Sequence, residues 1–150
     1  MTVSSVGTRG WAARPWQSKA SVSIQSDTLT IARMLELAVA ASQAVNDGKG
    51  WVSVRERSAS RIDLRVRDLV HSDGGEVMRF HVEVERVPGR VVVRSTIDTF
   101  SVKEGGFGAL TSVANRKIAG YGAYESYLEC LTAAVVAEDR NASVSFTTGK

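Results

Sequence analysis

The segment Val77–Val102 constrains the fold more than any other part of the chain. It reads VMRFHVEVERVPGRVVVRSTIDTFSV, two alternating segments that meet at Pro88-Gly89. Pro suits the first central position of a tight turn, and Gly suits the second, where φ is positive. The pattern therefore predicts an antiparallel β-hairpin, closed by a type II turn or by a longer loop with a bulge. Its first half has the period of two of a half-buried strand, with Met78, Phe80, Val82 and Val84 alternating with Arg79, His81, Glu83 and Glu85.

Symmetry about a two-residue loop predicts the register of this hairpin. Hydrophobic residues then face each other on one side, and opposite charges face each other on the other side, where each pair contributes about 0.2–1 kcal/mol. A slip of one residue would place every side chain on the wrong face. The predicted pairs are Val84 with Val93 and Phe80 with Ile97 on the buried side, and Glu83 with Arg94 and Arg79 with Asp98 on the exposed side.

A strand and a helix are predicted before this hairpin. Alternation over residues 16–25 indicates a strand, and Ser26 or Asp27 is expected to cap a helix over residues 28–46 that stops at Gly48. The apolar residues of this helix extend well beyond one face. Such a helix is either heavily buried, which we favour, or gives its second side to a partner or ligand.

A second strand pair is predicted over Trp51–Arg57 and Arg61–Arg67, with a three-residue loop between them. This loop length would set Arg55 opposite Asp63. Because both strands alternate apolar and polar residues, they are expected to join the hairpin in a four-stranded meander with one charged face.

The rest of the chain is predicted to hold one long loop and one more helix. Residues 103–120 are interrupted by glycines, with a short helical turn expected over Leu110–Lys117, and loops of this length are often functional. An apolar pattern over Tyr121–Glu138 predicts the second helix. Val144 and Phe146 allow a short final strand.

Together these elements predict an α+β fold, a two-layer sandwich in which two helices cover one face of a four- to six-stranded antiparallel sheet. The expected order is β-α-β-β-β-β-α, with a final β allowed by the last residues. Residues 1–15 are expected to form a disordered tail, and residues 16–150 a single domain. The order of elements resembles that of helix-grip proteins. That resemblance implies an apolar cavity between a curved sheet and the C-terminal helix, and no residue motif accompanies it.

Composition and motifs argue against several functional classes. The net charge is +3, and no run of residues has the length and hydrophobicity of a signal peptide or a membrane span, so a cytoplasmic protein is expected. The single Cys130 excludes an internal disulfide and is expected to be a buried, inert thiol. His71 and His81 are the only histidines, and their surroundings assemble no zinc ligands. We therefore expect no metal, no cofactor and no catalytic residues.

Three groups of residues remain as candidate sites. An aromatic cluster is either plain core or the wall of an apolar pocket, and it comprises Trp51, Phe80, Phe100, Tyr121, Tyr124 and Tyr127. An arginine-rich sheet face is a solvated face, a protein interface or, least favoured, a site for single-stranded nucleic acid, and it comprises Arg55, Arg57, Arg61, Arg65, Arg67 and Arg94. A glycine loop is a candidate lid, and it comprises Gly105, Gly106, Phe107 and Gly108.

The favoured functional hypothesis is a non-enzymatic interaction module. Such a module would self-associate or bind another protein through its sheet face or its first helix. The alternative is a small apolar-ligand binder with a pocket between the sheet and the C-terminal helix, and the third hypothesis is a binder of single-stranded nucleic acid.

Overall fold

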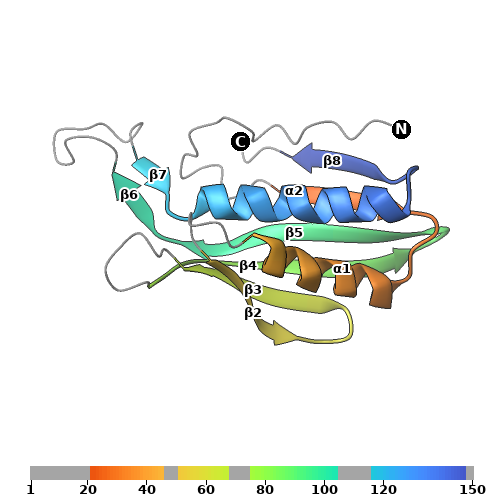
Figure 1. Ribbon diagram of the computed structural model, residues 1–150, viewed down its shortest axis with the longest axis horizontal. Helices are drawn as coiled ribbons and strands as arrows, with labels where there is room; N and C mark the ends of the chain where they lie inside the picture. The colour runs from red at the N-terminus through yellow and green to blue at the C-terminus, as the bar shows by residue number, and fades with distance from the viewer. Residues whose placement is uncertain (1–20, 46–50, 68–74, 105–115, 148–150) are drawn as a thin grey trace.

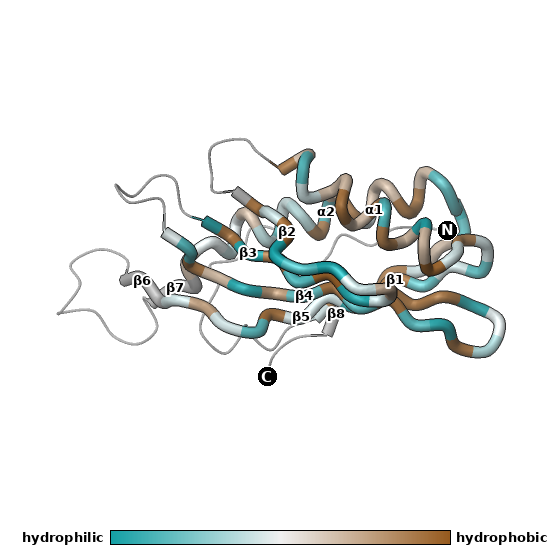
Figure 2. Tube along the Cα trace, turned by 90° about the horizontal axis from the view of Figure 1, so that it is seen from below, coloured by the Kyte–Doolittle hydropathy of each residue, from teal (hydrophilic) through white to brown (hydrophobic). Residues whose placement is uncertain are grey.

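The computed structural model describes residues 21–45, 51–67, 75–104 and 116–147. These residues form an α+β fold in which two helices cover one face of a six-stranded antiparallel sheet (Figures 1 and 2). A separate two-stranded sheet lies at one end. The elements are β1 (Ser21–Ser26), α1 (Ile31–Ala44), β2 (Trp51–Arg57), β3 (Arg61–Arg67), β4 (Glu76–Val87), β5 (Arg90–Phe100), β6 (Val102–Glu104), β7 (Arg116–Ile118), α2 (Tyr121–Glu138) and β8 (Ser143–Thr147).

The sheet has the strand order β2-β3-β4-β5-β1-β8, so the predicted meander of β2 to β5 is confirmed. β1 returns to pair with β5, and β8 adds to the far side of β1. The final strand that the last residues allowed is therefore present. Figure 1 shows β2 and β8 at opposite edges of the sheet, with α1 and α2 lying side by side across it.

The central hairpin has the predicted turn and most of the predicted register. Gly89 has a φ of +81°, as the second central position of a type II turn requires. The pairs Val84–Val93, Phe80–Ile97 and Glu83–Arg94 are confirmed.

The fourth predicted pair of the hairpin is wrong. Arg79 lies opposite Thr99 and not Asp98, because a register shift between Arg79 and Phe80 leaves Asp98 as an extra residue on β5. A β-bulge of this kind places two residues opposite one and redirects the extra side chain.

The strand pair β2–β3 contains a second correction. Asp63 pairs with Glu56 and not with Arg55, because the register shifts between Val54 and Glu56. Arg55 is the extra residue of this bulge. The loop between the strands has the expected length, since the amide of Ser58 donates to the carbonyl of Arg61 at 2.8 Å.

The start of α1 also differs from the prediction. Thr30 is the N-cap, and its hydroxyl accepts a hydrogen bond from the amide of Arg33 at 3.1 Å. Ser26 is the buried last residue of β1, and its hydroxyl donates to the carboxylate of Asp139 at 2.6 Å. Strand β1 therefore runs through the position at which we expected the cap. The predicted stop at Gly48 lies outside the described residues.

The region before α2 is strand where a helical turn was expected. Arg116–Ile118 pairs with Val102–Glu104 as β7 and β6, and the rest of the predicted turn lies outside the described residues. Gly120 is the N-cap of α2 and has a φ of +82°, a backbone conformation that residues other than glycine rarely adopt. The glycine loop and the predicted tail are also outside the described part.

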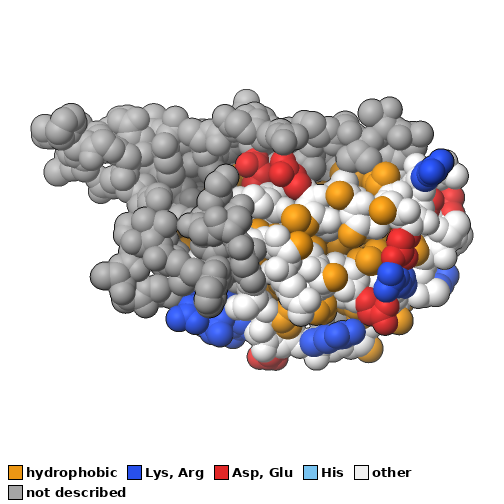
Figure 3. Space-filling view, in the orientation of Figure 1, with side chains coloured by type: hydrophobic (Ala, Val, Ile, Leu, Met, Phe, Trp, Pro, Cys, Tyr) orange, Lys and Arg blue, Asp and Glu red, His pale blue; other side chains and the backbone are white. Residues whose placement is uncertain are grey.

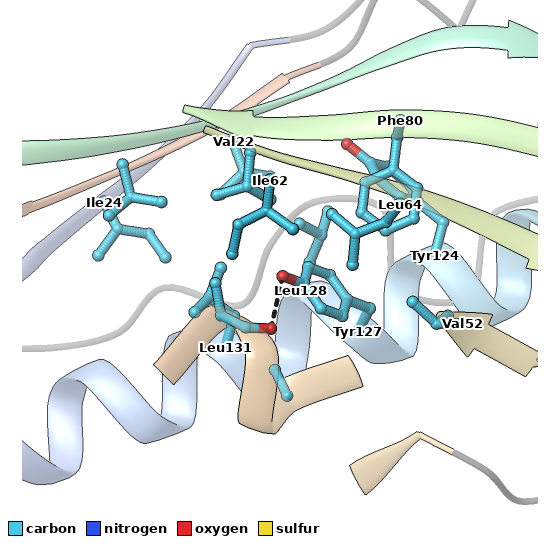
Figure 4. Close-up of a cluster of buried hydrophobic side chains, with 14 of the residues drawn as sticks. Val22, Ile24, Val52, Ile62, Leu64, Phe80, Tyr124, Tyr127, Leu128 and Leu131 are labelled. Carbon is cyan, nitrogen blue, oxygen red and sulfur yellow. Dashed lines mark hydrogen bonds between the residues drawn. The ribbon is translucent and has the colours of Figure 1, made fainter. Parts of the chain in front are cut away.

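The hydrophobic core lies between the sheet and the helix layer. Inward-facing residues of β1, β3 and β4 meet the buried side of both helices, as Figure 4 shows for Val22, Ile62, Leu64 and Leu128. Each of these four side chains is at most 2% exposed. This arrangement leaves the other face of the sheet and the outer side of the helices as the two large surfaces of the described structure.

Candidate functional site: the helix surface and the sheet faces

Four of the six residues predicted to line a pocket lie in the core. Phe80 makes edge-on contacts with Tyr124 and Tyr127, with ring centroids 4.8 and 5.2 Å apart. Tyr121 packs against Tyr124 at 5.8 Å, and none of the four residues is more than 5% exposed. These contacts are those of a packed aromatic cluster between the sheet and α2.

The two central tyrosine hydroxyls have partners within the protein. The Tyr124 hydroxyl lies 3.0 Å from the Ser95 hydroxyl, and the Tyr127 hydroxyl donates to the carbonyl of Ala38 at 2.9 Å, the dashed line in Figure 4. Burial raises the pKa of Tyr124 and Tyr127 well above the usual tyrosine value. Both hydroxyls therefore stay protonated, and Tyr127 ties α2 to α1.

The other two predicted lining residues add little to this cluster. Phe100 is half-buried and packs against the edge of the core. The side chain of Trp51 lies outside the described part, as do the four residues of the predicted lid. The pocket therefore stays a prediction, and the described contacts show the tyrosine hydroxyls directed at protein atoms.

Acidic residues lie among the arginines of the predicted sheet face and pair with several of them. Arg61 donates to Asp63 at 2.9 Å, Arg94 to Glu85 at 3.3 Å, and Arg79 to Glu76 at 2.6 Å. Glu83 lies opposite Arg94 as predicted, yet the guanidinium reaches Glu85, two residues farther along β4. Pairing of this kind lowers the positive potential that a phosphate backbone would need.

The remaining predicted arginines do not share one face. The bulge of β2 sets Arg57 opposite Ile62, a core residue, so Arg57 lies on the helix side of the sheet and not on the charged face as predicted. Arg65 donates to the Ser53 hydroxyl at 3.3 Å. Arg67, the last residue of β3, is half-buried. Arg55 and Arg57 are exposed on the edge strand β2, so the structure does not gather the six predicted residues into one patch.

His81 lies at the centre of this charged face. Its Nδ1 is 2.8 Å from Asp98, the residue that the β5 bulge displaces, and its Nε2 is 3.3 Å from Glu83. The imidazole is only 12% exposed. No group of three or more histidine, cysteine or acidic residues suited to a metal ion occurs in the described ranges.

The outer side of α1 and α2 is the feature that sequence reasoning located only in part. We call it the helix surface. Most of its exposed members are alanines, with Gln43 in the middle of α1 and Glu36 nearer its start, and its half-buried members are mostly apolar. The exposed alanines are Ala32, Ala40, Ala44, Ala133 and Ala137, and the half-buried apolar residues are Ile31, Val39, Cys130, Ala134 and Val136.

Charge is nearly absent from the centre of the helix surface. No charged residue occurs in Leu37–Ala44 of α1 or in Cys130–Ala137 of α2. Figure 3 shows hydrophobic side chains spread over the helices, with most charged side chains near the rim of the described area. Cys130 is half-buried here, and not buried as predicted, because it lies on the outer side of α2.

An ion pair joins the two helices at one end of this surface. The guanidinium of Arg33 donates through Nε to Glu138 at 2.9 Å and through a second nitrogen to the same carboxylate. Its third nitrogen donates to Glu36 at 2.8 Å. These hydrogen bonds raise the pKa of Arg33 and lower that of Glu138. Because Arg33 lies in the first turn of α1 and Glu138 is the last residue of α2, the helices run antiparallel.

A signal in the sequence could have found the second half of the helix surface. Between Glu129 and Glu138 the chain reads CLTAAVVA, which gives α2 apolar residues on its outer side as well as its inner side. From the sequence we expected an unusually wide apolar surface on the first helix alone.

Comparison with known proteins adds no family to this description. No protein-family model, no curated protein and no solved structure matches the chain. Neither of the two helices in the described residues is long and apolar enough to cross a membrane.

Proposed function

We propose that this chain is a non-enzymatic interaction module that binds a protein partner through its helix surface. The observation that carries the proposal is that no charged residue lies in the middle of either helix, where the exposed residues are Ala40, Gln43 and Ala44 on α1 and Ala133 and Ala137 on α2. Helices at a protein surface usually place charged and polar residues opposite the core. An outer side that is apolar on two neighbouring helices is typical of a surface that another protein covers.

The chemistry of the helix surface suits association. Alanine loses no side-chain rotamer freedom when it is buried, so a partner that covers Ala40 and Ala133 pays little entropy there. The absence of charge between Leu37 and Ala44 means that no ion has to be desolvated. The expected partner presents bulkier apolar side chains, which fit against small residues.

Co-purification with matched variants tests this proposal. The tagged chain is isolated from cells in three forms, as wild type, as Ala40→Glu and as Ala59→Glu. Ala40 is exposed on α1, and Ala59 is exposed in the turn between β2 and β3, so both substitutions add one charge at an exposed position. We expect a stoichiometric partner with the wild type and with Ala59→Glu, and its loss with Ala40→Glu.

The outcome that would refute the proposal is equal recovery of the same proteins by all three forms. Glutamate is a good helix former, so Ala40→Glu is expected to keep the thermal unfolding midpoint of the wild type. That midpoint is measured on the same preparations, so loss of binding is separated from loss of folding.

The other two hypotheses have less support from the described contacts. An apolar-ligand binder needs space beside Tyr124 and Tyr127, whose rings and hydroxyls contact protein groups. A nucleic-acid binder needs unpaired cations along a groove, whereas Arg61, Arg79 and Arg94 each contact a carboxylate.

A further inference from the structure

The two edges of the six-stranded sheet are built differently. β2 carries a bulge at Arg55 and three consecutive charged residues, which are common protections against pairing with another chain. β8 reads SVSFT and pairs with β1 over five residues without a register shift. Within the described residues it pairs with β1 alone and carries no charge, proline or bulge.

The hairpin turn determines which residues of β5 direct their backbone N–H and C=O groups at β4. A two-residue loop at Pro88-Gly89 is closed by a hydrogen-bonded pair, and such pairs recur at every second position along an antiparallel ladder. Glu83 and Arg94 are therefore a hydrogen-bonded pair, with the backbone groups of Arg94 directed at β4. The amide of Val84, the next residue along β4, is consistent with this alternation, because it points away from β5 and donates to the Ser60 carbonyl at 2.8 Å.

The same alternation of hydrogen-bonded and non-hydrogen-bonded pairs continues across β1 to the edge strand β8. Ser23 of β1 lies opposite Arg94 of β5. The backbone N–H and C=O groups of Arg94 are directed at β4, so Ser23 and Arg94 are a non-hydrogen-bonded pair, and the N–H and C=O groups of Ser23 are directed at β8. Ser23 and Ser145 are then a hydrogen-bonded pair. The neighbours of Ser145 alternate with it, so the N–H and C=O groups of Val144 and Phe146 point away from β1, toward the side of β8 on which no other described strand pairs.

These open groups are spaced for pairing with an identical strand. If a second β8 lies antiparallel with Ser145 on the two-fold axis, Val144 of one copy faces Phe146 of the other in both directions. Each such pair can exchange two hydrogen bonds. The two-fold axis then lies perpendicular to the sheet, so the helix layers of both copies stay on the same side.

The surroundings of the edge also suit a second copy of this chain. Ser145 is small, uncharged and exposed, and in this register it faces its own copy. The adjacent outer-face residues of β1 are Ser21, Ser23 and Gln25, so no charge on β1 or β8 opposes the approach of an identical edge. Two β2 strands centred on Glu56 would instead set two glutamates opposite each other.

We propose that β8 is a homodimerisation edge, at which two copies join their sheets through antiparallel β8 strands centred on Ser145. This inference goes beyond the proposed function, because it names a different surface and a different partner from those of the helix surface.

Charge substitution at the two-fold axis tests the proposal. In Ser145→Lys two lysines would face each other across the axis, and in Ser145→Glu two glutamates would do so, while an equal mixture brings opposite charges together. Sedimentation and native mass spectrometry measure the assembly. We expect a concentration-dependent dimer for the wild type, a monomer for each variant alone, and a mixed dimer from the two variants together.

Two further variants separate this surface from others. Ala59→Lys adds the same charge at a distant exposed turn and is expected to leave the dimer intact. A wild-type chain that is monomeric at all concentrations would overturn the proposal, and so would a dimer that survives Ser145→Lys. A dimer that is lost in Ala40→Glu and kept in Ser145→Lys would place self-association on the helix surface instead.

Discussion

The contact between Ser26 and Asp139 allows the most detailed prediction. The Ser26 hydroxyl donates to one carboxylate oxygen at 2.6 Å, and the amide of Asn141 donates to the other at 2.9 Å. Ser26 also accepts from the amides of Thr28 and Leu29 at 3.2 and 3.1 Å. The pair thus joins the end of α2 to the turn between β1 and α1, and both residues are buried.

We expect Ser26→Ala to destabilise the protein at neutral pH. The substitution removes a hydrogen bond to a buried charged group, which contributes about 1.5–3 kcal/mol, and it deprives two amides of their acceptor. The expected loss is about 2–3 kcal/mol. For a chain of this size 1 kcal/mol corresponds to about 2–4 °C, so the thermal midpoint should fall by about 5–10 °C.

The loss should depend on pH with a defined sign. The hydrogen bond from Ser26 lowers the pKa of Asp139, aided by the Asn141 amide and opposed by burial. Because the folded-state pKa lies below the unfolded value of about 3.9, this stabilisation is complete above that value and disappears as the pH falls through the folded-state pKa. The stability difference between wild type and Ser26→Ala should therefore narrow below about pH 4.

Urea unfolding of both proteins at a series of pH values measures this difference. Ser23→Ala is the matched control, since Ser23 lies on the outer face of the same strand, and it should change stability by less than about 0.5 kcal/mol. The reasoning is refuted by a Ser26→Ala loss as small as that of the control at pH 7. A loss that stays constant through low pH would refute the assigned role of the Asp139 charge.

Further predictions concern glycines and a buried hydroxyl, each measured by urea unfolding. Gly120→Ala should destabilise the protein by about 2 kcal/mol or more, because φ is +82° and the new Cβ would lie 2.9 Å from the side chains of Val66 and Val77. The new Cβ of Gly122→Ala would meet nothing within 4 Å, so this substitution should be neutral or stabilising by up to about 1 kcal/mol. Equal effects of the two substitutions would contradict this account. Tyr127→Phe should lose about 1 kcal/mol with its bond to α1, and an unchanged stability would show that this bond contributes nothing.

Local patterns in the sequence predicted the hairpin, and local exceptions limited the prediction. Alternation and the Pro88-Gly89 turn act within a few residues of each other, so they determine the pairs nearest the turn. Register symmetry holds as far as Ile97 and fails at Asp98 because a bulge inserts one residue there. The bulge at Arg55 has the same effect on the neighbouring pair. Neither bulge has a glycine to mark it in the sequence.

Long-range contacts account for the rest of what sequence reasoning missed. Ser26, Asp27, Thr28 and Thr30 are all chemically suitable caps for α1, and the choice of Thr30 depends on Ser26 being held by Asp139, far along the chain. The place of β1 between β5 and β8 also depends on such pairing. β6 and β7 are three residues each, which is too short for a periodic signal.

The candidate surface was predictable in part for a similar reason. The wide apolar pattern of α1 indicated either deep burial or a partner, and the structure buries Leu37 while leaving Ala40 exposed. Only the placement of α1 beside α2 shows that their apolar outer sides lie in one layer. Four of the six aromatic residues predicted to line a pocket lie in the core, where the hydroxyls of Tyr124 and Tyr127 have partners on β5 and α1.

Site-specific photo-crosslinking in cells tests the proposed binding surface most directly. A photoreactive residue replaces Ala40 on the helix surface in one form and Ala59 in the β2–β3 turn in another. The proposed function predicts a discrete cross-linked adduct from position 40 and none from position 59, and the adduct mass distinguishes another protein from a second copy of the chain. No adduct at position 40, or the same adducts from both positions, would contradict the claim that a protein partner covers the helix surface.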